Sequence, residues 1–190
     1  MRRSLLALVA AVLLTACNQG GGDQGSAPAT AAPNDADVTF TQKMIPHHQQ
    51  GIEMAKAVDA RTKRPQLRTL ADAITVSQGQ EVTLMQRWLQ DWGKPATLQG
   101  MDHGAGHMPG MMSEAQMRQL MATKNQEFDL AFVDLMTTHH QGAIDMATTE
   151  LRDGSLPQVK RLAQQIIDTQ QAEIDQFTVW QEEWEAAPIR

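Results

Sequence analysis

An internal repeat is the feature that most restricts how this chain can fold. When the sequence is shifted along itself by 92 residues, residues 37–92 align without a gap on residues 129–184, and 18 of the 56 aligned pairs are identical. Average amino-acid usage would give roughly three or four identities over that length. The two segments are therefore copies of one unit, and the fold must accommodate that unit twice.

Each copy is predicted to form two helices. In the first copy, core-type residues recur at alternating spacings of three and four residues, which is the period of one helix face. That series is Phe40, Met44, His47, Gly51, Met54 and Val58. Pro65 and Pro157 suit the first turn of the second helix in each copy, whereas Gly93 and Gly154 mark helix ends. Four helices of roughly 25–30 residues, about 40 Å long, predict an all-α antiparallel four-helix bundle made of two duplicated helix pairs.

The N-terminus has the pattern of a bacterial lipoprotein signal. Arg2 and Arg3 precede a short apolar run, and small residues lead to Cys17, the only Cys in the chain. We therefore expect a signal peptide over residues 1–16, lipid attachment at Cys17 and a membrane anchor; the alternative is an ordinary cleaved signal. Residues 17–36, rich in Gly, Pro and Ala, are expected to be a flexible tether. The domain, residues 37–185, would then start near Asp37 and face the periplasm or another extracytoplasmic space of the cell envelope.

Composition and charge exclude several classes of protein. The net charge is −6, with no basic stripe that could neutralise phosphates, so a nucleic-acid partner is not expected. One Cys excludes an intramolecular disulfide, a Cys-based zinc site and an iron–sulfur cluster. The sequence contains no nucleophile elbow, P-loop or dinucleotide fingerprint. A di-iron carboxylate bundle is disfavoured because each copy offers one inward Glu and no Glu-x-x-His motif.

Paired histidines occupy equivalent positions in the two copies. They are His47, His48, His139 and His140, and they lie on the predicted core face. Each facing helix carries a Gln and a Glu among apolar residues: Gln78 and Glu81, repeated as Gln170 and Glu173. Since a buried carboxylate needs a partner, a histidine opposite it is expected. Two interpretations stay open: a hydrogen-bond network that fixes helix register, or metal-ligating histidines that the Gln and Glu side chains orient from behind.

Methionines accompany the histidines in the helices and in the connector between the copies. The helical ones are Met44, Met54, Met136 and Met146, which could be metal ligands or could simply fill gaps in the core. In the connector, residues 93–128, the candidate ligands are Met101, His103, His107, Met108, Met111 and Met112. Thioether and imidazole together favour copper, especially Cu(I). The alternative is a connector that merely covers the apolar end of the bundle. Within the connector, the Ser113-x-x-Gln116 pattern predicts a capped helix over about residues 114–122.

The repeated pattern resembles that of a bacterial family. His-His-Gln followed by Ile, Met and Ala stands at residues 47–55 and again at 139–147, together with the connector methionines and the Gln-x-x-Glu of each second helix. This resembles the domain of unknown function 305 family over roughly residues 37–185. The resemblance implies a ferritin-like helical bundle and, by similarity to periplasmic members, a role in copper binding and tolerance.

The sequence thus predicts an envelope lipoprotein that binds and sequesters copper as a metal-ion partner. We expect it to hold the metal rather than catalyse a reaction. The first alternative is a structural or interaction module without metal, acting through a protein partner that the sequence does not identify. The second is a metal-dependent redox enzyme.

Overall fold

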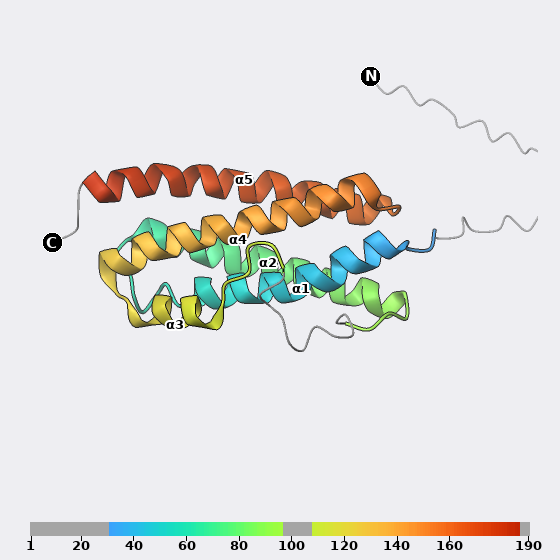
Figure 1. The fold of residues 1–190 in the computed structure, drawn as a ribbon, viewed down its shortest axis with the longest axis horizontal. Coiled ribbons are helices and arrows are strands. Elements are labelled where there is room, and N and C mark those ends of the chain that lie inside the picture. Colours follow the sequence, from blue (N-terminus) through green and yellow to red (C-terminus); the bar gives the residue numbers. More distant parts are fainter. Residues whose placement is uncertain (1–30, 97–107, 187–190) are drawn as a thin grey trace, which may run out of the picture. The chain divides into compact units, whose positions relative to one another are not determined.

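The computed structural model describes residues 31–96 and 108–186, and this part of the chain is helical without any β-strand (Figure 1). Its helices are α1 (Asp35–Lys56), α2 (Pro65–Asp91), α3 (Glu114–Ala122), α4 (Asn125–Asp153) and α5 (Pro157–Ala186). The predicted all-α fold is confirmed, with two long helices in each copy of the repeat.

Most helix ends lie where the sequence places them. α2 and α5 begin at Pro65 and Pro157, and α2 ends two residues before Gly93, whose φ of 64° suits glycine. α3 has the predicted capping box. The Ser113 hydroxyl accepts the N–H of Gln116, and the Gln116 amide oxygen accepts the N–H of Ser113.

The start of α1 has a capping box that was not predicted from the sequence. The helix begins at Asp35 and is capped by Asn34. The Asn34 amide oxygen accepts the Asp37 N–H at 2.9 Å, while the Asp37 carboxylate accepts the Asn34 N–H at 2.7 Å. This reciprocal box uses Asp at the position where the usual pattern has Glu or Gln, so the pattern alone did not reveal it.

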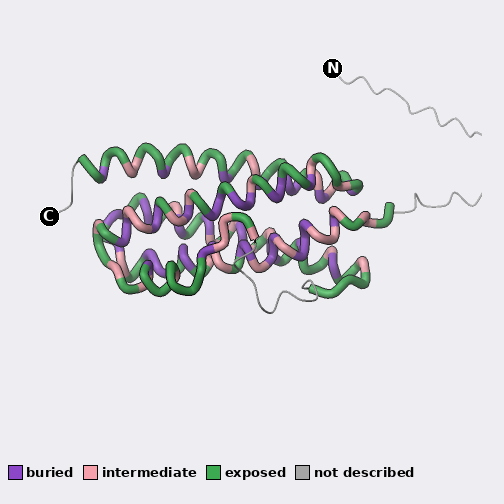
Figure 2. The backbone as a smooth tube through the Cα atoms, in the orientation of Figure 1, coloured by how far each residue is buried: buried purple, intermediate pink, exposed green. Residues whose placement is uncertain are grey.

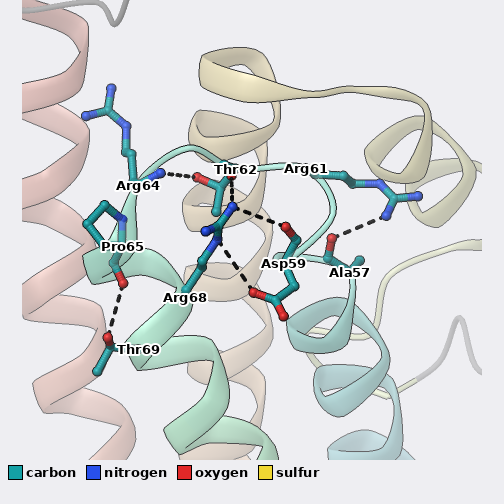
Figure 3. A network of polar contacts seen from close by, with 8 residues as sticks. All are labelled: Ala57, Asp59, Arg61, Thr62, Arg64, Pro65, Arg68 and Thr69. Atoms are coloured by element: carbon teal, nitrogen blue, oxygen red, sulfur yellow. Dashed lines mark hydrogen bonds and ion pairs between the residues drawn. The ribbon is translucent and has the colours of Figure 1, made fainter.

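α1 is also shorter than predicted, at 22 residues, because its last turn gives way to a structured loop over residues 57–64. Arg68 of α2 donates to the Thr62 carbonyl at 2.7 Å and also contacts Asp59 (Figure 3). The Arg61 carbonyl accepts the Asn125 N–H at 2.6 Å. The loop therefore ties the start of α4 to the α1–α2 pair.

Packing joins the two copies rather than keeping them apart. α1 packs along α2, α4 packs along α5, and the two pairs meet mainly through α1 and α4, with α3 against α4. Buried positions follow one face of each long helix (Figure 2).

The apolar interior consists of two separate cores. The first core contains Met54, Val58, Leu67, Ile74, Met112, Leu120, Phe128, Phe132, Met136, Phe177 and Trp184 among others. The second core contains Phe40, Met44, Ile45, Val82, Met85, Leu89, Ala143, Met146, Val159, Leu162 and Ile166 among others. The first core combines the last half of α1 with the first half of α4, and the second core combines the first half of α1 with the last half of α4. Each core therefore needs residues from both copies. A single copy would leave these faces exposed.

Equivalent aspartates anchor α1 and α4 in different ways. Asp129 of α4 accepts the Arg64 Nε–H at 3.0 Å, and the Arg64 guanidinium stacks on Trp184 at 4.2 Å. Asp37 of α1 has no arginine in that place and accepts N–H and O–H groups from Ser155 and the N–H of Leu156.

A second acid, Glu150 of α4, lies beside Asp37 and is 1% exposed. Burial, followed by the hydrogen bond and charge of Asp37, raises the pKa of Glu150 to about 8. The carboxyl is therefore protonated at neutral pH and can share its proton with Asp37.

Glu150→Gln should flatten the pH dependence of stability. Because the pKa of Glu150 is raised above its usual 4.5 in the folded state, its contribution is full below pH 4.5 and is lost as the pH rises through about 8. The wild-type free energy of unfolding should therefore fall across this window relative to that of the variant. Urea unfolding at several pH values measures the difference. The exposed Glu53→Gln serves as control, and equal slopes for wild type and Glu150→Gln would contradict the assignment.

Candidate metal centre

The four paired histidines lie together between the two apolar cores. His47 and His48 of α1 and His139 and His140 of α4 are all 0% exposed. The spacing of three and four residues puts each histidine pair on the inner face of its helix, about halfway along it. The contact between α1 and α4 brings the two pairs together. The ring centroids of His47 and His139 are 3.8 Å apart, and those of His139 and His140 are 6.2 Å apart. The sequence prediction that these side chains face the interior is confirmed.

Acceptors face the Nε2 atoms of these rings. His47 Nε2 lies 3.0 Å from the Pro109 carbonyl oxygen, and His139 Nε2 lies 2.9 Å from the carbonyl oxygen of His47. His48 Nε2 lies 2.6 Å from the Glu81 carboxylate. Carbonyl and carboxylate oxygens accept hydrogen bonds, so Nε2 carries a proton in each of these rings.

The fourth histidine repeats the arrangement with poorer alignment. His140 Nε2 is 2.6 Å from the Glu173 carboxylate, but it lies outside the directions of a good hydrogen bond. The expected histidine opposite each glutamate is thus found in both copies, as His48 for Glu81 and His140 for Glu173. Glu81 and Glu173 remain partly exposed, at 20% and 11% of their side chains.

All four Nδ1 atoms are buried and have no hydrogen-bond partner among the described residues. Leaving a buried polar group unpaired costs about 1–3 kcal/mol. The unpaired nitrogens therefore oppose folding unless they find a partner that the described residues do not supply. A metal-ligating histidine typically donates its other N–H to a carbonyl or carboxylate, as these rings do.

Both glutamines that the sequence placed in this layer are buried. Gln78 and Gln170 are each 3% exposed. Neither the nitrogen nor the oxygen of the Gln78 amide has a partner in the described chain, and the Gln170 oxygen also lacks one. Gly51 makes room for the Gln78 amide, because a Cβ at position 51 would lie 2.6 Å from Gln78 Oε1 and 3.0 Å from His139 Cε1.

Burial keeps the central rings neutral. Desolvation, and then the neighbouring His48 and His140, lower the pKa of His47 to about 3, although the Pro109 carbonyl opposes the shift. Desolvation, and then the neighbouring histidines, hold the pKa of His139 well below its usual value. Neutral imidazole is the form that binds metal.

The helical methionines belong to the apolar cores on either side of the layer. Met44 and Met146 lie in the second core, and Met54 and Met136 lie in the first. Among the connector candidates, Met112 is 3% exposed and packs in the first core, while Met108 and Met111 are half-buried. Met101, His103, His107 and Cys17 lie outside the described residues.

Within residues 31–96 and 108–186, no group of three or more His, Cys, Asp or Glu side chains is arranged to hold a metal ion. Methionine thioethers are not among these groups. A centre that combines imidazole with Met ligands, as suits Cu(I), needs fewer such groups.

Three contributors to the site were not predicted: the Pro109 carbonyl, the amide of Gln50 and the missing side chain of Gly142. Gln50 forms two hydrogen bonds with the backbone of Met112. Gly142 packs directly on Pro109. The sequence did carry a signal for two of them, because positions 50 and 142 are equivalent in the repeat and differ inside an otherwise matching His-His-Gln pattern.

Comparison with known proteins identifies the family of this chain. The family model described as Domain of unknown function (DUF305) matches residues 37–181. The chain belongs to the DUF305 family. A DUF305 protein from Streptomyces coelicolor is 31% identical, with a TM-score of 0.73 over 78% of this chain and 93% of that one. A DUF305 fragment from Deinococcus radiodurans is also 31% identical, with a TM-score of 0.73 over 80% and 99%.

CopM is a further relative, with structures in copper-bound and silver-bound forms. Its Cu(II)-bound form is 34% identical, with a TM-score of 0.68 over 78% of this chain and 97% of CopM. Structures of CopM with Cu(I) and with silver also match. The comparison with curated proteins gave no match.

The N-terminal expectation is supported as well. Residues 1–18 match the prokaryotic membrane lipoprotein lipid attachment site. This match indicates a membrane-anchored, extracytoplasmic protein. None of the described helices is long and apolar enough to cross a membrane.

In metal-free protein, His47 and His139 should stay neutral at pH 5. A free imidazole with a pKa of about 6.5 is almost fully protonated there, whereas burial lowers the pKa of His47 to about 3 and holds that of His139 well below its usual value. Ring ¹⁵N chemical shifts across a pH titration measure this directly, with the urea-unfolded chain as reference. Titration of either folded ring near pH 6.5 would show that the rings are not held as described.

Proposed function

We propose that this protein binds and sequesters copper, preferentially Cu(I), at the layer of paired histidines. His47, His48, His139 and His140 would be the Nδ1 donors of this layer, and since no three such groups among the described residues are arranged around one ion, methionine thioethers would complete the coordination. Glu81 and Glu173 would hold two of the rings from their Nε2 side, and Gln78 and Gln170 would complete the polar surroundings. The observation that carries the proposal is the set of four buried, unpartnered Nδ1 atoms.

Ligand chemistry supports copper over harder metals. Met44, Met54, Met136 and Met146 lie in the cores next to the histidine layer. The connector adds Met101, Met108, Met111 and Met112 with His103 and His107. Thioethers are soft ligands that select Cu(I), and outside the cytoplasm they avoid the oxidation that would disable a thiol. Copper and silver in CopM structures are consistent with this preference.

Burial supports storage rather than turnover. All four histidines are fully buried, so a metal ion held by them would be shielded from water and from substrates. Copper supplies redox chemistry when bound, and a shielded position restrains that reactivity. Acylation at Cys17, after loss of residues 1–16, would anchor the domain at 37–185 to the envelope through the tether at 17–36, facing the periplasm.

The competing interpretation is a purely structural polar layer that serves an interaction module. A network that only fixed helix register would satisfy its polar atoms. The unpaired Nδ1 atoms and the unpaired Gln78 amide favour the metal interpretation instead.

Anaerobic Cu(I) titration against a chromophoric chelator tests the proposal. Wild-type protein should bind Cu(I) tightly, and His47→Gln with His139→Gln should weaken binding at least tenfold because two Nδ1 ligands are lost. Replacement of Met101, Met108, Met111 and Met112 by Leu should weaken binding if the connector contributes ligands. Circular dichroism verifies that each variant remains helical.

A matched pair of surface acids provides the control. Glu53 and Asp145 are equivalent in the repeat and exposed, so their conversion to Gln and Asn should leave Cu(I) affinity unchanged. Absence of Cu(I) binding by wild type would refute copper sequestration and favour the interaction module. Binding that survives loss of His47 and His139 would refute the histidine layer as the site.

A further inference from the structure

The segment Met108–Met112 lies across the histidine layer and is fixed there by hydrogen bonds. The Pro109 carbonyl oxygen lies 3.0 Å from His47 Nε2. Three residues later, Gln50 of α1 donates to the Met112 carbonyl at 2.9 Å and accepts the Met112 N–H at 2.7 Å. The Met111 N–H donates to the Met108 carbonyl at 3.2 Å, which closes a turn between these points.

Glycine allows this segment to approach α4 closely. A Cβ at Gly142 would lie 2.1 Å from the Pro109 carbonyl oxygen and 2.4 Å from its carbon. Both are backbone atoms that cannot move aside without shifting the segment. Gly110 has a φ of 73°, and a Cβ there would lie 2.6 Å from the Thr138 carbonyl oxygen. The position of the Pro109 carbonyl thus depends on contacts that larger residues would prevent.

The repeat explains why the connector docks in one orientation. Gln50 and Gly142 occupy the same position in the two copies. In the first copy this position carries the amide that holds Met112; in the second it leaves the space that Pro109 fills. The two central histidines consequently have different acceptors: Pro109 for His47, and the carbonyl of His47 for His139.

We infer that Pro109, held by Gly142 and Gln50, positions His47 for metal binding by fixing the proton on its Nε2. The segment 108–112 is then a working part of the histidine layer. The effect of this inference on metal affinity rests on the proposed function, whereas the contact between Pro109 and His47 is a property of the metal-free protein. Gly142 and Gln50 act here as positioning residues, since neither is a ligand.

The first test reads the tautomer of His47 by ring ¹⁵N NMR in metal-free protein. Gly142→Ala adds the methyl group that displaces Pro109, and His47 should lose its defined Nε2–H signature while His48 and His139 keep theirs. Gln50→Met, which keeps side-chain length but cannot hold Met112, should produce the same selective change. Because the two variants lie on different helices, each one still tests the inference if the other folds poorly.

Gly79→Ala is the matched control. Gly79 is also a helical glycine, but a Cβ there would meet no described atom within 4 Å. This variant should be slightly more stable, by the helix propensity of alanine, and should leave every histidine signal unchanged. A selective His47 change in Gly79→Ala, or none in both Gly142→Ala and Gln50→Met, would overturn the inference.

Cu(I) titration of the same variants separates this inference from the proposed function. Loss of a group that orients a ligating histidine typically weakens metal affinity 10–100-fold, so Gly142→Ala and Gln50→Met should bind at least tenfold more weakly than Gly79→Ala. If wild type binds no Cu(I), the proposed function fails, whereas the NMR result still decides whether Pro109 positions His47. If wild type binds and all three variants bind equally, the positioning role is refuted and the function stands.

Discussion

The unpaired Nδ1 atoms of four buried histidines are the constraint around which this domain is organised. Burial of polar groups without partners opposes folding, so the two apolar cores on either side must supply the stability that the layer does not. On the proposed function, the feature that weakens the metal-free domain at its centre would also prepare it for a metal ion, because burial keeps His47 and His139 neutral.

Duplication gives this arrangement its form. One copy of the helix pair supplies two histidines and half of each core, and neither core is complete without the other copy. Joining the copies in one chain makes their association intramolecular, so assembly of the layer does not depend on protein concentration. The helix pairs meet through α1 and α4, the helices that carry the histidines.

Periodicity and the repeat were sufficient to predict the helices, the inward histidines and the glutamates opposite them. Those features depend on spacing within a helix, and spacing is visible in sequence. The early end of α1 and the Asn34–Asp37 cap were missed because they depend on loop contacts and on a less common cap residue. The role of Pro109 was missed for a different reason: a backbone carbonyl has no residue-type signature, and its position is set by contacts with residues far along the chain. Whether the methionines are ligands stays a prediction, since their burial in the cores is also what gap-filling residues would show.

The contrast between Gln50 and Gly142 has a consequence for anyone who would idealise this protein. A consensus of the two copies would place one residue type at both positions. Glutamine at 142 would strike the backbone of Pro109, and glycine at 50 would release Met112. A perfectly symmetric version could keep every helix and every histidine and still lose the connector's place on the layer. The place of the connector on the histidine layer therefore depends on the difference between the two copies at this position.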